Sequence, residues 1–274
     1  MKSNYLLALL TLIFAGCVKP APTIFPQHTG LKILSWKGTS VAAPDDGSDS
    51  VKITYNRAGN PVRIQRIHTS TGYPHYKLQY DQQQRLTDLI EFYGTNEQIG
   101  DVFHAWHKFV HDNQNRIIRD SIYVFGFFGP HGPLPRPHSS GIDDLYSYAY
   151  DAQNRMVKMT RKMGDLNSDD ITTNYHYNSQ GNVYWIKVRQ PNTDSLQYPN
   201  ADIYPTYDHQ FNPHRLHPVW QFIDRDYNNN NPFNAASYNI YGLPTSIPID
   251  PTLGYFSYFG IIGFKTIDHI KYGY

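Results

Sequence analysis

A short motif returns seven times along this 274-residue chain, and it limits the possible folds more than any other feature. In its clearest form it reads Tyr-Asp, then Gln or Asn residues, then Arg; in a second form a glycine stands before the last residue. The motifs begin at His111 and at six tyrosines: Tyr55, Tyr80, Tyr150, Tyr177, Tyr207 and Tyr238. The steps between them are 25, 31, 39, 27, 30 and 31 residues. This spacing indicates a repeat architecture with loop insertions.

The residues that flank each motif alternate in polarity. Val51, Ile53 and Tyr55 alternate with Lys52 and Thr54, for example, and similar patterns surround the other copies. A period of two with aromatic and β-branched residues predicts strands with one buried face. The Asp, Asn and Gly residues between them form turns, so the motif aspartates are predicted to be turn formers and not catalytic acids. Turns are expected at 81–85, 112–116, 151–155 and 178–182.

We therefore expect an all-β fold, in which one long, curved antiparallel sheet of roughly 12–16 strands is built from consecutive hairpins. The motif tyrosines should lie on one face, with hydroxyls that reach water. A short helix near 213–224, with Leu216, Trp220 and Ile223 on one side, should cover part of the sheet. Residues 255–274 should supply the closing strands. The alternative is a closed barrel or a two-sheet sandwich, which would also hide strand edges.

The repeats resemble the tyrosine-aspartate (YD) repeats of RHS and teneurin shells, from about Leu31 to Ile247. The chain resembles even more closely Gram-negative outer-membrane lipoproteins of unknown function that contain fewer such hairpins. The resemblance implies a spiralling hairpin sheet. The chain is too short for a large shell, and Asp250–Gly254 only faintly resembles the proline- and glycine-rich segment that ends such shells. A toxin-encapsulating role is therefore not implied.

The N-terminus has the pattern of a bacterial lipoprotein. Residues 1–16 read as a signal peptide, with Lys2 before an apolar run that is too short for an ordinary membrane span. Phe14-Ala15-Gly16-Cys17 resembles a lipobox, although Phe14 replaces the usual leucine, and Cys17 is the only cysteine. Lipid attachment at Cys17 is the one site residue that the sequence predicts; an ordinary signal peptide with an incidental cysteine is the alternative. Residues 17–30 would form a proline-containing tether, and 31–274 a single β-repeat domain.

Charge and motifs exclude several functions. The whole chain has 24 basic and 23 acidic residues, so the chain without Lys2 has 24 − 1 = 23 basic residues and no net charge. A neutral chain argues against nucleic acid as a partner. The thirteen histidines are scattered. His104, His107 and His111 are the nearest to a cluster, but 104 and 107 would face opposite sides of a strand. No nucleophile elbow, phosphate loop or zinc-protease helix occurs. No catalytic, cofactor-binding or metal residue is predicted, and no cofactor.

Two loops invite functional hypotheses. Residues 125–138 contain four prolines and could be gripped by a partner, but we favour an insertion that folds its phenylalanines back onto the sheet. Residues 164–170 offer alternate oxygen ligands, as calcium loops do. They lack a glycine at the sixth position and have His176 at the twelfth, so a plain polar loop is favoured.

The sequence favours a non-catalytic, lipid-anchored binding or scaffold module of the outer membrane, facing either the periplasm or the exterior. Its partners would be the membrane, through the lipid, and a protein or a glycan. Trp36, Trp106, Trp185 and Trp220 could stack on sugar rings, although core packing is the favoured reading. The competing hypothesis is an envelope- or glycan-directed hydrolase with acids from loops 165–170 or 200–208.

Overall fold

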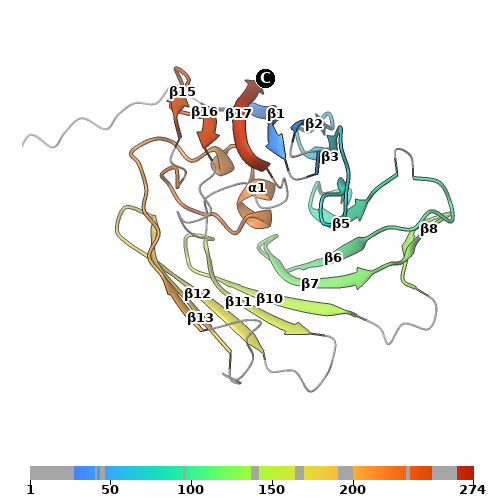
Figure 1. The fold of residues 1–274 in the computed structure, drawn as a ribbon. Coiled ribbons are helices and arrows are strands. Elements are labelled where there is room, and N and C mark those ends of the chain that lie inside the picture. The colour runs from blue at the N-terminus through green and yellow to red at the C-terminus, as the bar shows by residue number, and fades with distance from the viewer. Residues whose placement is uncertain are drawn as a thin grey trace, which may run out of the picture.

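The chain folds around one large antiparallel sheet, seen in the computed structural model (Figure 1). The structure describes residues 28–40, 42–43, 47–94, 97–136, 142–163, 170–190, 200–232, 235–248 and 264–274. The sheet has 15 strands in the order β14-β13-β12-β11-β10-β7-β6-β5-β4-β3-β2-β1-β17-β16-β15. This confirms the predicted all-β fold and the expected number of strands.

The strands have the following bounds: β1 (Lys32–Ser40), β2 (Ser48–Tyr55), β3 (Pro61–Arg66), β4 (His75–Tyr80), β5 (Leu86–Phe92), β6 (Ala105–His111), β7 (Ile117–Val124), β10 (Asp144–Tyr150), β11 (Met156–Met163), β12 (Ile171–Tyr177), β13 (Val183–Arg189), β14 (Ala201–Ile203), β15 (Ser237–Tyr238), β16 (Pro244–Pro248) and β17 (Phe264–Gly273). A separate two-stranded sheet joins β8 (Phe127–Gly129) to β9 (Gly132–Leu134). The late helical segment consists of a 3₁₀ helix, η2 (Pro213–Leu216), and α1 (Pro218–Ile223).

The sheet is open. Its order begins at β14 and ends at β15, so it is neither the closed barrel nor the sandwich considered as alternatives. Strand β17 pairs with β1 on one side and with β16 on the other, which confirms the expected closing strand for residues 264–273; residues 255–263 lie outside the described residues. Figure 1 shows the sheet curving around α1, so that the helix lies on its concave side.

The predicted turns are present and share one geometry. In the turn between β4 and β5, the Asp81 N–H donates to the Arg85 carbonyl at 3.0 Å. The Asp81 Oδ1 atom accepts the backbone N–H groups of Gln83 and Arg85, each at 2.9 Å. Gln84 lies in the left-handed region, with φ of 61°. The turns 112–116 and 151–155 repeat these contacts with Asn115 and Asn154 at the left-handed position. Local hydrogen bonds from one side chain therefore fix each turn.

Four motif tyrosines, Tyr55, Tyr80, Tyr150 and Tyr177, pack on the core side of the sheet, as predicted, but their hydroxyls bind backbone carbonyls and are not directed to water. The Tyr80 hydroxyl donates to the Pro61 carbonyl at 2.7 Å, and the Tyr177 hydroxyl donates to the Met156 carbonyl at 2.9 Å. Each acceptor is the first residue after the preceding turn. The same bond joins these further pairs: Tyr55 to Ile33, Tyr150 to Ile117, Tyr207 to Val183 and Tyr272 to Pro244. Most of these bonds link one repeat to the repeat before it.

The helical segment covers the core, as expected, but it breaks at His217. Asn212 accepts the His214 N–H and caps η2, and the His217 ring accepts the Val219 N–H and caps α1. Buried Trp220 packs edge-to-face against Trp36, with ring centroids 6.3 Å apart. A proline at the start of each short helix suits its missing N–H. Thus two capped turns, and not one continuous helix, close the concave side.

The insertions lie away from the motif turns. The short turns all lie between strands of one hairpin, whereas the connections between hairpins vary in length. In the 125–136 region, Phe128 is buried against Phe92 and Phe103, as the favoured reading predicted, while Phe125 stays 54% exposed. The calcium hypothesis concerns residues 164–170, of which 164–169 lie outside the described residues. Cys17 and the tether up to residue 27 also lie outside them.

Candidate functional site

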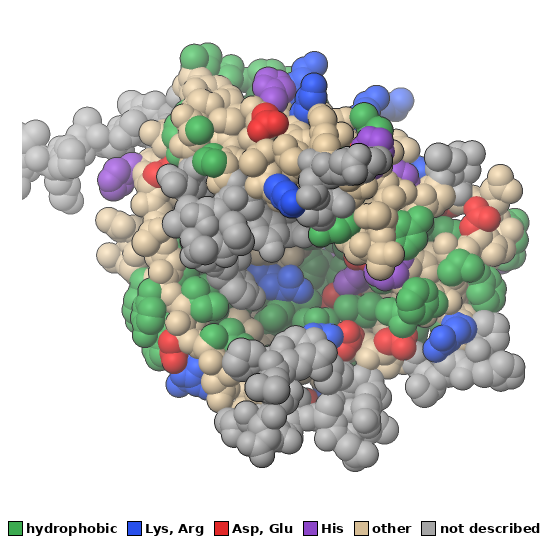
Figure 2. Space-filling model, in the orientation of Figure 1, with side chains coloured by type: hydrophobic (Ala, Val, Ile, Leu, Met, Phe, Trp, Pro, Cys, Tyr) green, Lys and Arg blue, Asp and Glu red, His purple; other side chains and the backbone are tan. Residues whose placement is uncertain are grey.

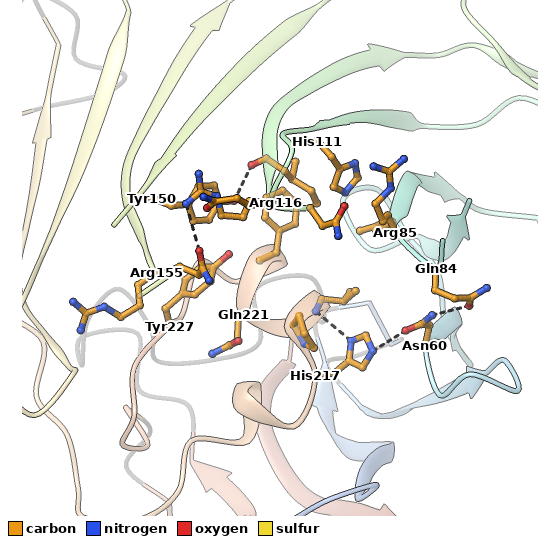
Figure 3. Close-up of a pocket in the computed structure, with 18 of the residues that line it drawn as sticks. Asn60, Gln84, Arg85, His111, Arg116, Tyr150, Arg155, His217, Gln221 and Tyr227 are labelled. Atoms are coloured by element: carbon orange, nitrogen blue, oxygen red, sulfur yellow. Dashed lines mark hydrogen bonds between the residues drawn. The ribbon is translucent and has the colours of Figure 1, made fainter. Parts of the chain in front are cut away.

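A cavity of about 950 Å³ lies where three motif turns face the α1 segment. We call it the turn-edge cavity (Figure 3). Its lining comes from three sources: the turns at 83–86, 114–117 and 153–155 with the preceding residues Tyr80, His111 and Tyr150; residues Arg215, His217–Val219, Gln221 and Phe222 of the helical segment; and Asn60, Tyr227 and Asn229. The turns and the helix caps therefore place the lining directly.

The lining is rich in hydrogen-bond donors. It includes the guanidinium groups of Arg85, Arg116, Arg155 and Arg215 and many asparagine and glutamine amides. Among the described residues that line it there is no aspartate or glutamate. Burial lowers the pKa of His217 to about 4, and burial together with the Arg85 charge lowers the pKa of His111. Both imidazoles are therefore neutral at neutral pH, and the fixed charge of the lining is positive.

Aspartates outside the lining hold the turn arginines in place. The Asp112 Oδ2 atom accepts a hydrogen bond from the Nε–H of Arg116 at 2.8 Å and lies 2.7 Å from the Nη2 atom of the same arginine. The Arg116 guanidinium also lies over the ring of Tyr150, 5.3 Å from its centroid. Arg155 repeats this arrangement with Asp151 and, at 4.1 Å, with the ring of Tyr177. A guanidinium has five N–H donors, so these contacts orient it and leave donors for a ligand.

His111 explains why the cavity opens at this place. It occupies the motif position that is tyrosine in the neighbouring repeats, where the hydroxyl binds the carbonyl of the preceding repeat. An imidazole is shorter than a phenol and has no hydroxyl for that bond. In this repeat the carbonyl that a tyrosine hydroxyl would reach belongs to Leu86, the first residue after the preceding turn. Both His111 and Leu86 line the cavity. The sequence showed this departure from the motif, and it is the signal that could have located the cavity.

A second group of titratable side chains lies on the core side of the sheet; we call Glu91, His104, His107 and Asp120 the histidine cluster. The Nδ1 atom of His104 lies 2.9 Å from Glu91, and the Nδ1 atom of His107 lies 2.9 Å from Asp120. The Nε2 atom of His107 is 3.8 Å from Glu91. The prediction that His104 and His107 face opposite sides is wrong: His104 precedes β6, so the strand alternation does not extend to it.

The charges of the histidine cluster compensate one another. Burial would raise the pKa of Glu91, but hydrogen bonds with the two histidines lower it to about 2. Burial would lower the pKa of His107, but Asp120 and Glu91 raise it to about 9. Glu91 and His107 are therefore both charged at neutral pH. No group of three or more His, Cys, Asp or Glu side chains in the described part of the chain is arranged to hold a metal ion.

A third cluster is fully enclosed. Buried His214 lies 2.8 Å from Asp224 and 2.7 Å from Asp226, and Asp226 also accepts amide hydrogens from Asn212 and Asn228. All five side chains belong to the helical segment or the loop that follows it. Asn228 Oδ1 also accepts the Val183 N–H of β13 at 2.6 Å, which joins the network to the sheet. The network is closed to ligands, since His214 and Asp226 are at most 1% exposed.

The other candidate residues are dispersed. Three tryptophans (Trp36, Trp106 and Trp220) are core residues with at most 8% exposure, which agrees with the favoured reading. Trp185 stacks on His176 and donates to Asp202. In the loop 200–208, Asp202 pairs with Arg189, and Asp208 bonds Tyr238 and Asn231. The acids proposed for a hydrolase therefore do not meet in the described part of that loop.

Figure 2 shows a face of the molecule with a hollow, where hydrophobic, basic, acidic and histidine side chains all occur. No helix among the described residues is long and apolar enough to cross a membrane.

The comparisons with known proteins give little. No protein-family model matches the sequence, and no curated protein is similar to it. Among solved structures the chain is similar to the TcdB2-TccC3-TEV crystal structure, at 14% identity and a TM-score of 0.32 over 74% of this chain and 10% of that one. It is also similar to TcdB2-TccC3 (8% identity, TM-score 0.25, 79% of this chain and 14% of that one) and to the Photorhabdus luminescens Tc holotoxin pore (8% identity, TM-score 0.22, 73% and 13%). The chain thus spans a small part of those chains, and TM-scores this low carry no argument about fold or function.

Proposed function

We propose that the chain is a lipid-anchored, non-catalytic binding module of the bacterial outer membrane whose ligand occupies the turn-edge cavity. The observation that carries the proposal is the composition of the lining: guanidinium, amide, imidazole and aromatic groups, without a carboxylate among the described residues. Such groups can hold a ligand by many hydrogen bonds. General acid–base catalysis instead needs groups that titrate near the working pH. The imidazoles of this cavity have lowered pKa values.

The competing hydrolase hypothesis draws no support from the histidine cluster. Its carboxylates and imidazoles come together, which is the arrangement expected of an acid–base site. However, Glu91 with a pKa of about 2 and His107 with a pKa of about 9 are each held in the charged form. A hydrolase would have to take its acids from elsewhere in the chain, and this hypothesis stays a prediction.

The proposed anchor is the lipid on Cys17. A diacylglyceryl group and an amide-linked chain together exceed the single chain that gives only reversible membrane binding. The Cys17→Ser variant is expected to leave the membrane fraction or to accumulate unprocessed. Unchanged fractionation of that variant would contradict the anchor.

The binding role is tested with the full chain in detergent, used to capture material from envelope extracts. The wild type is compared with Arg116→Gln, which changes the cavity, and with Arg119→Gln, an exposed arginine of β7 outside the lining. We expect a captured component that the wild type and the Arg119 variant retain and the Arg116 variant loses, and that is recovered without chemical change. A component that is turned over, or capture that is equal in all three, would refute the proposal.

A further inference from the structure

The turn-edge cavity contains a regular series of arginines. Arg85, Arg116 and Arg155 occupy the same position, the last residue of the motif, in three successive hairpins. The two flanking hairpins have asparagine there, Asn60 and Asn182. The series therefore has three members and ends on both sides, and all three arginines line the cavity.

The sheet sets the spacing of these arginines. Their hairpins, β4-β5, β6-β7 and β10-β11, are neighbours in the strand order β11-β10-β7-β6-β5-β4. Neighbouring strands lie about 4.8 Å apart, so equivalent positions in adjacent hairpins are separated by about 10 Å. The aspartate of each turn and, for two of the arginines, the tyrosine ring of the next repeat hold the guanidinium groups in this register.

Beside the arginine series, at its Asn60 end, the lining offers polar groups that suit hydroxyls. The Gln84 side-chain oxygen accepts one hydrogen bond from the Asn60 amide, at 3.0 Å, and the His217 Nε2 atom lies 3.0 Å from Asn60 Oδ1. Gln221 and Tyr227 complete the side opposite the turns (Figure 3). Amides both donate and accept, whereas guanidinium groups only donate. The site thus has spaced cationic donors for acidic groups and, beside them, amides for uncharged polar groups.

We propose that the turn-edge cavity binds an extended acidic oligosaccharide with one anionic group per disaccharide, each group paired with one turn arginine. This inference rests on the proposed function. A disaccharide in an extended glycan is comparable in length to the separation of two hairpins. Carboxylate and phosphate oxygens match the planar guanidinium donors, and the amides match sugar hydroxyls. No carboxylate is among the described lining residues, since Asp81, Asp112 and Asp151, which pair with the turn arginines, lie outside the lining.

The test uses the full chain in detergent and an array of unsulfated hyaluronan, chondroitin and heparosan hexasaccharides, each with three carboxylates. The methyl ester of each is the matched uncharged probe. We expect at least one hexasaccharide to bind, its methyl ester to bind at least about tenfold more weakly, and the binding to weaken as salt is raised.

Three variants connect the binding to the geometry. Arg116→Gln should weaken it by about tenfold or more, since a charge-assisted hydrogen bond is lost, while Arg119→Gln should leave it unchanged. His111→Tyr should fill the cavity and restore the hydroxyl contact of the motif. It should therefore reduce binding without lowering the unfolding temperature, which separates a lost site from a lost fold.

Two outcomes overturn the inference in different ways. If a hexasaccharide and its methyl ester bind equally, recognition of acidic groups is wrong, while binding in the cavity still stands. If no hexasaccharide binds, the acidic-glycan assignment is wrong. The envelope capture that depends on Arg116 then decides separately whether the cavity binds a different ligand or the proposed function also fails.

Discussion

The bond from the Tyr177 hydroxyl to the preceding repeat predicts a measurable contribution to stability. In the Tyr177→Phe variant the ring is kept, so its packing and the Arg155 guanidinium 4.1 Å from its centroid remain. Only the hydroxyl that donates to the Met156 carbonyl at 2.9 Å is removed. Met156 is fully buried, so water cannot easily replace that donor. The expected loss is about 1 kcal/mol for the hydrogen bond, and up to about 3 kcal/mol if the carbonyl is left unsatisfied.

The assay is equilibrium unfolding in urea followed by tryptophan fluorescence. With a denaturant slope of about 3 kcal/mol/M, a loss of 1 kcal/mol lowers the midpoint by about 0.3 M. Tyr184→Phe is the matched control, since Tyr184 is 51% exposed, and it should change stability by less than about 0.5 kcal/mol. Equal midpoints for the two variants would refute the argument that the hydroxyl joins the repeats.

Three further outcomes are expected. Proton NMR of the imidazoles should show His107 titrating at about pH 9, and an ordinary pKa would contradict its pairing with Asp120. Because the folded pKa lies above the unfolded value of 6.5, the stabilisation from this pairing is complete below pH 6.5 and is lost as the pH rises through 9. Gly181→Ala should cost more stability in urea unfolding than Gly72→Ala, because both glycines have positive φ but only at 181 would the new Cβ meet Asn229; equal losses would remove that contact as the cause. Burial raises the pKa of the motif tyrosines above 10, so these tyrosines should stabilise the fold below pH 10 and lose that contribution above it. In an absorbance titration the tyrosines should ionise at higher pH in the folded chain than in urea, and coincident curves would contradict the raised pKa values.

The turns and strands were predictable because their signals are local. One aspartate or asparagine bonds the backbone of its own turn, and residues on one strand alternate without reference to the rest of the chain. The prediction of a helix near 213–224 was correct in position, because the prolines and the spacing of apolar residues are local too. Its division at His217 was missed, although Pro218 after a capping residue is the signal for a new helix start.

The missed features depend on contacts between distant residues. Alternation assigns a tyrosine to a face, but it cannot say that the Tyr207 hydroxyl will meet the Val183 carbonyl. The pairing of β1 with β17 joins residues more than two hundred positions apart, and no local pattern specifies it. The turn-edge cavity also needs three hairpins and the α1 segment to be placed together. For the histidine cluster, the error came from extending a strand by one residue to His104.

The hydroxyl bonds between repeats also bear on how such a chain can change its length over evolution. Except at β6-β7, where His111 replaces the tyrosine, a hairpin brings the tyrosine that bonds its predecessor and leaves a carbonyl for its successor, so a duplicated hairpin would find both contacts ready. Duplications next to β3 or β12 would extend the sheet beside the arginine series. A duplication between Arg85 and Arg155 would instead alter the spacing within it. The chain can thus gain whole hairpins on either flank while the spacing that we assign to its ligand is inherited unchanged.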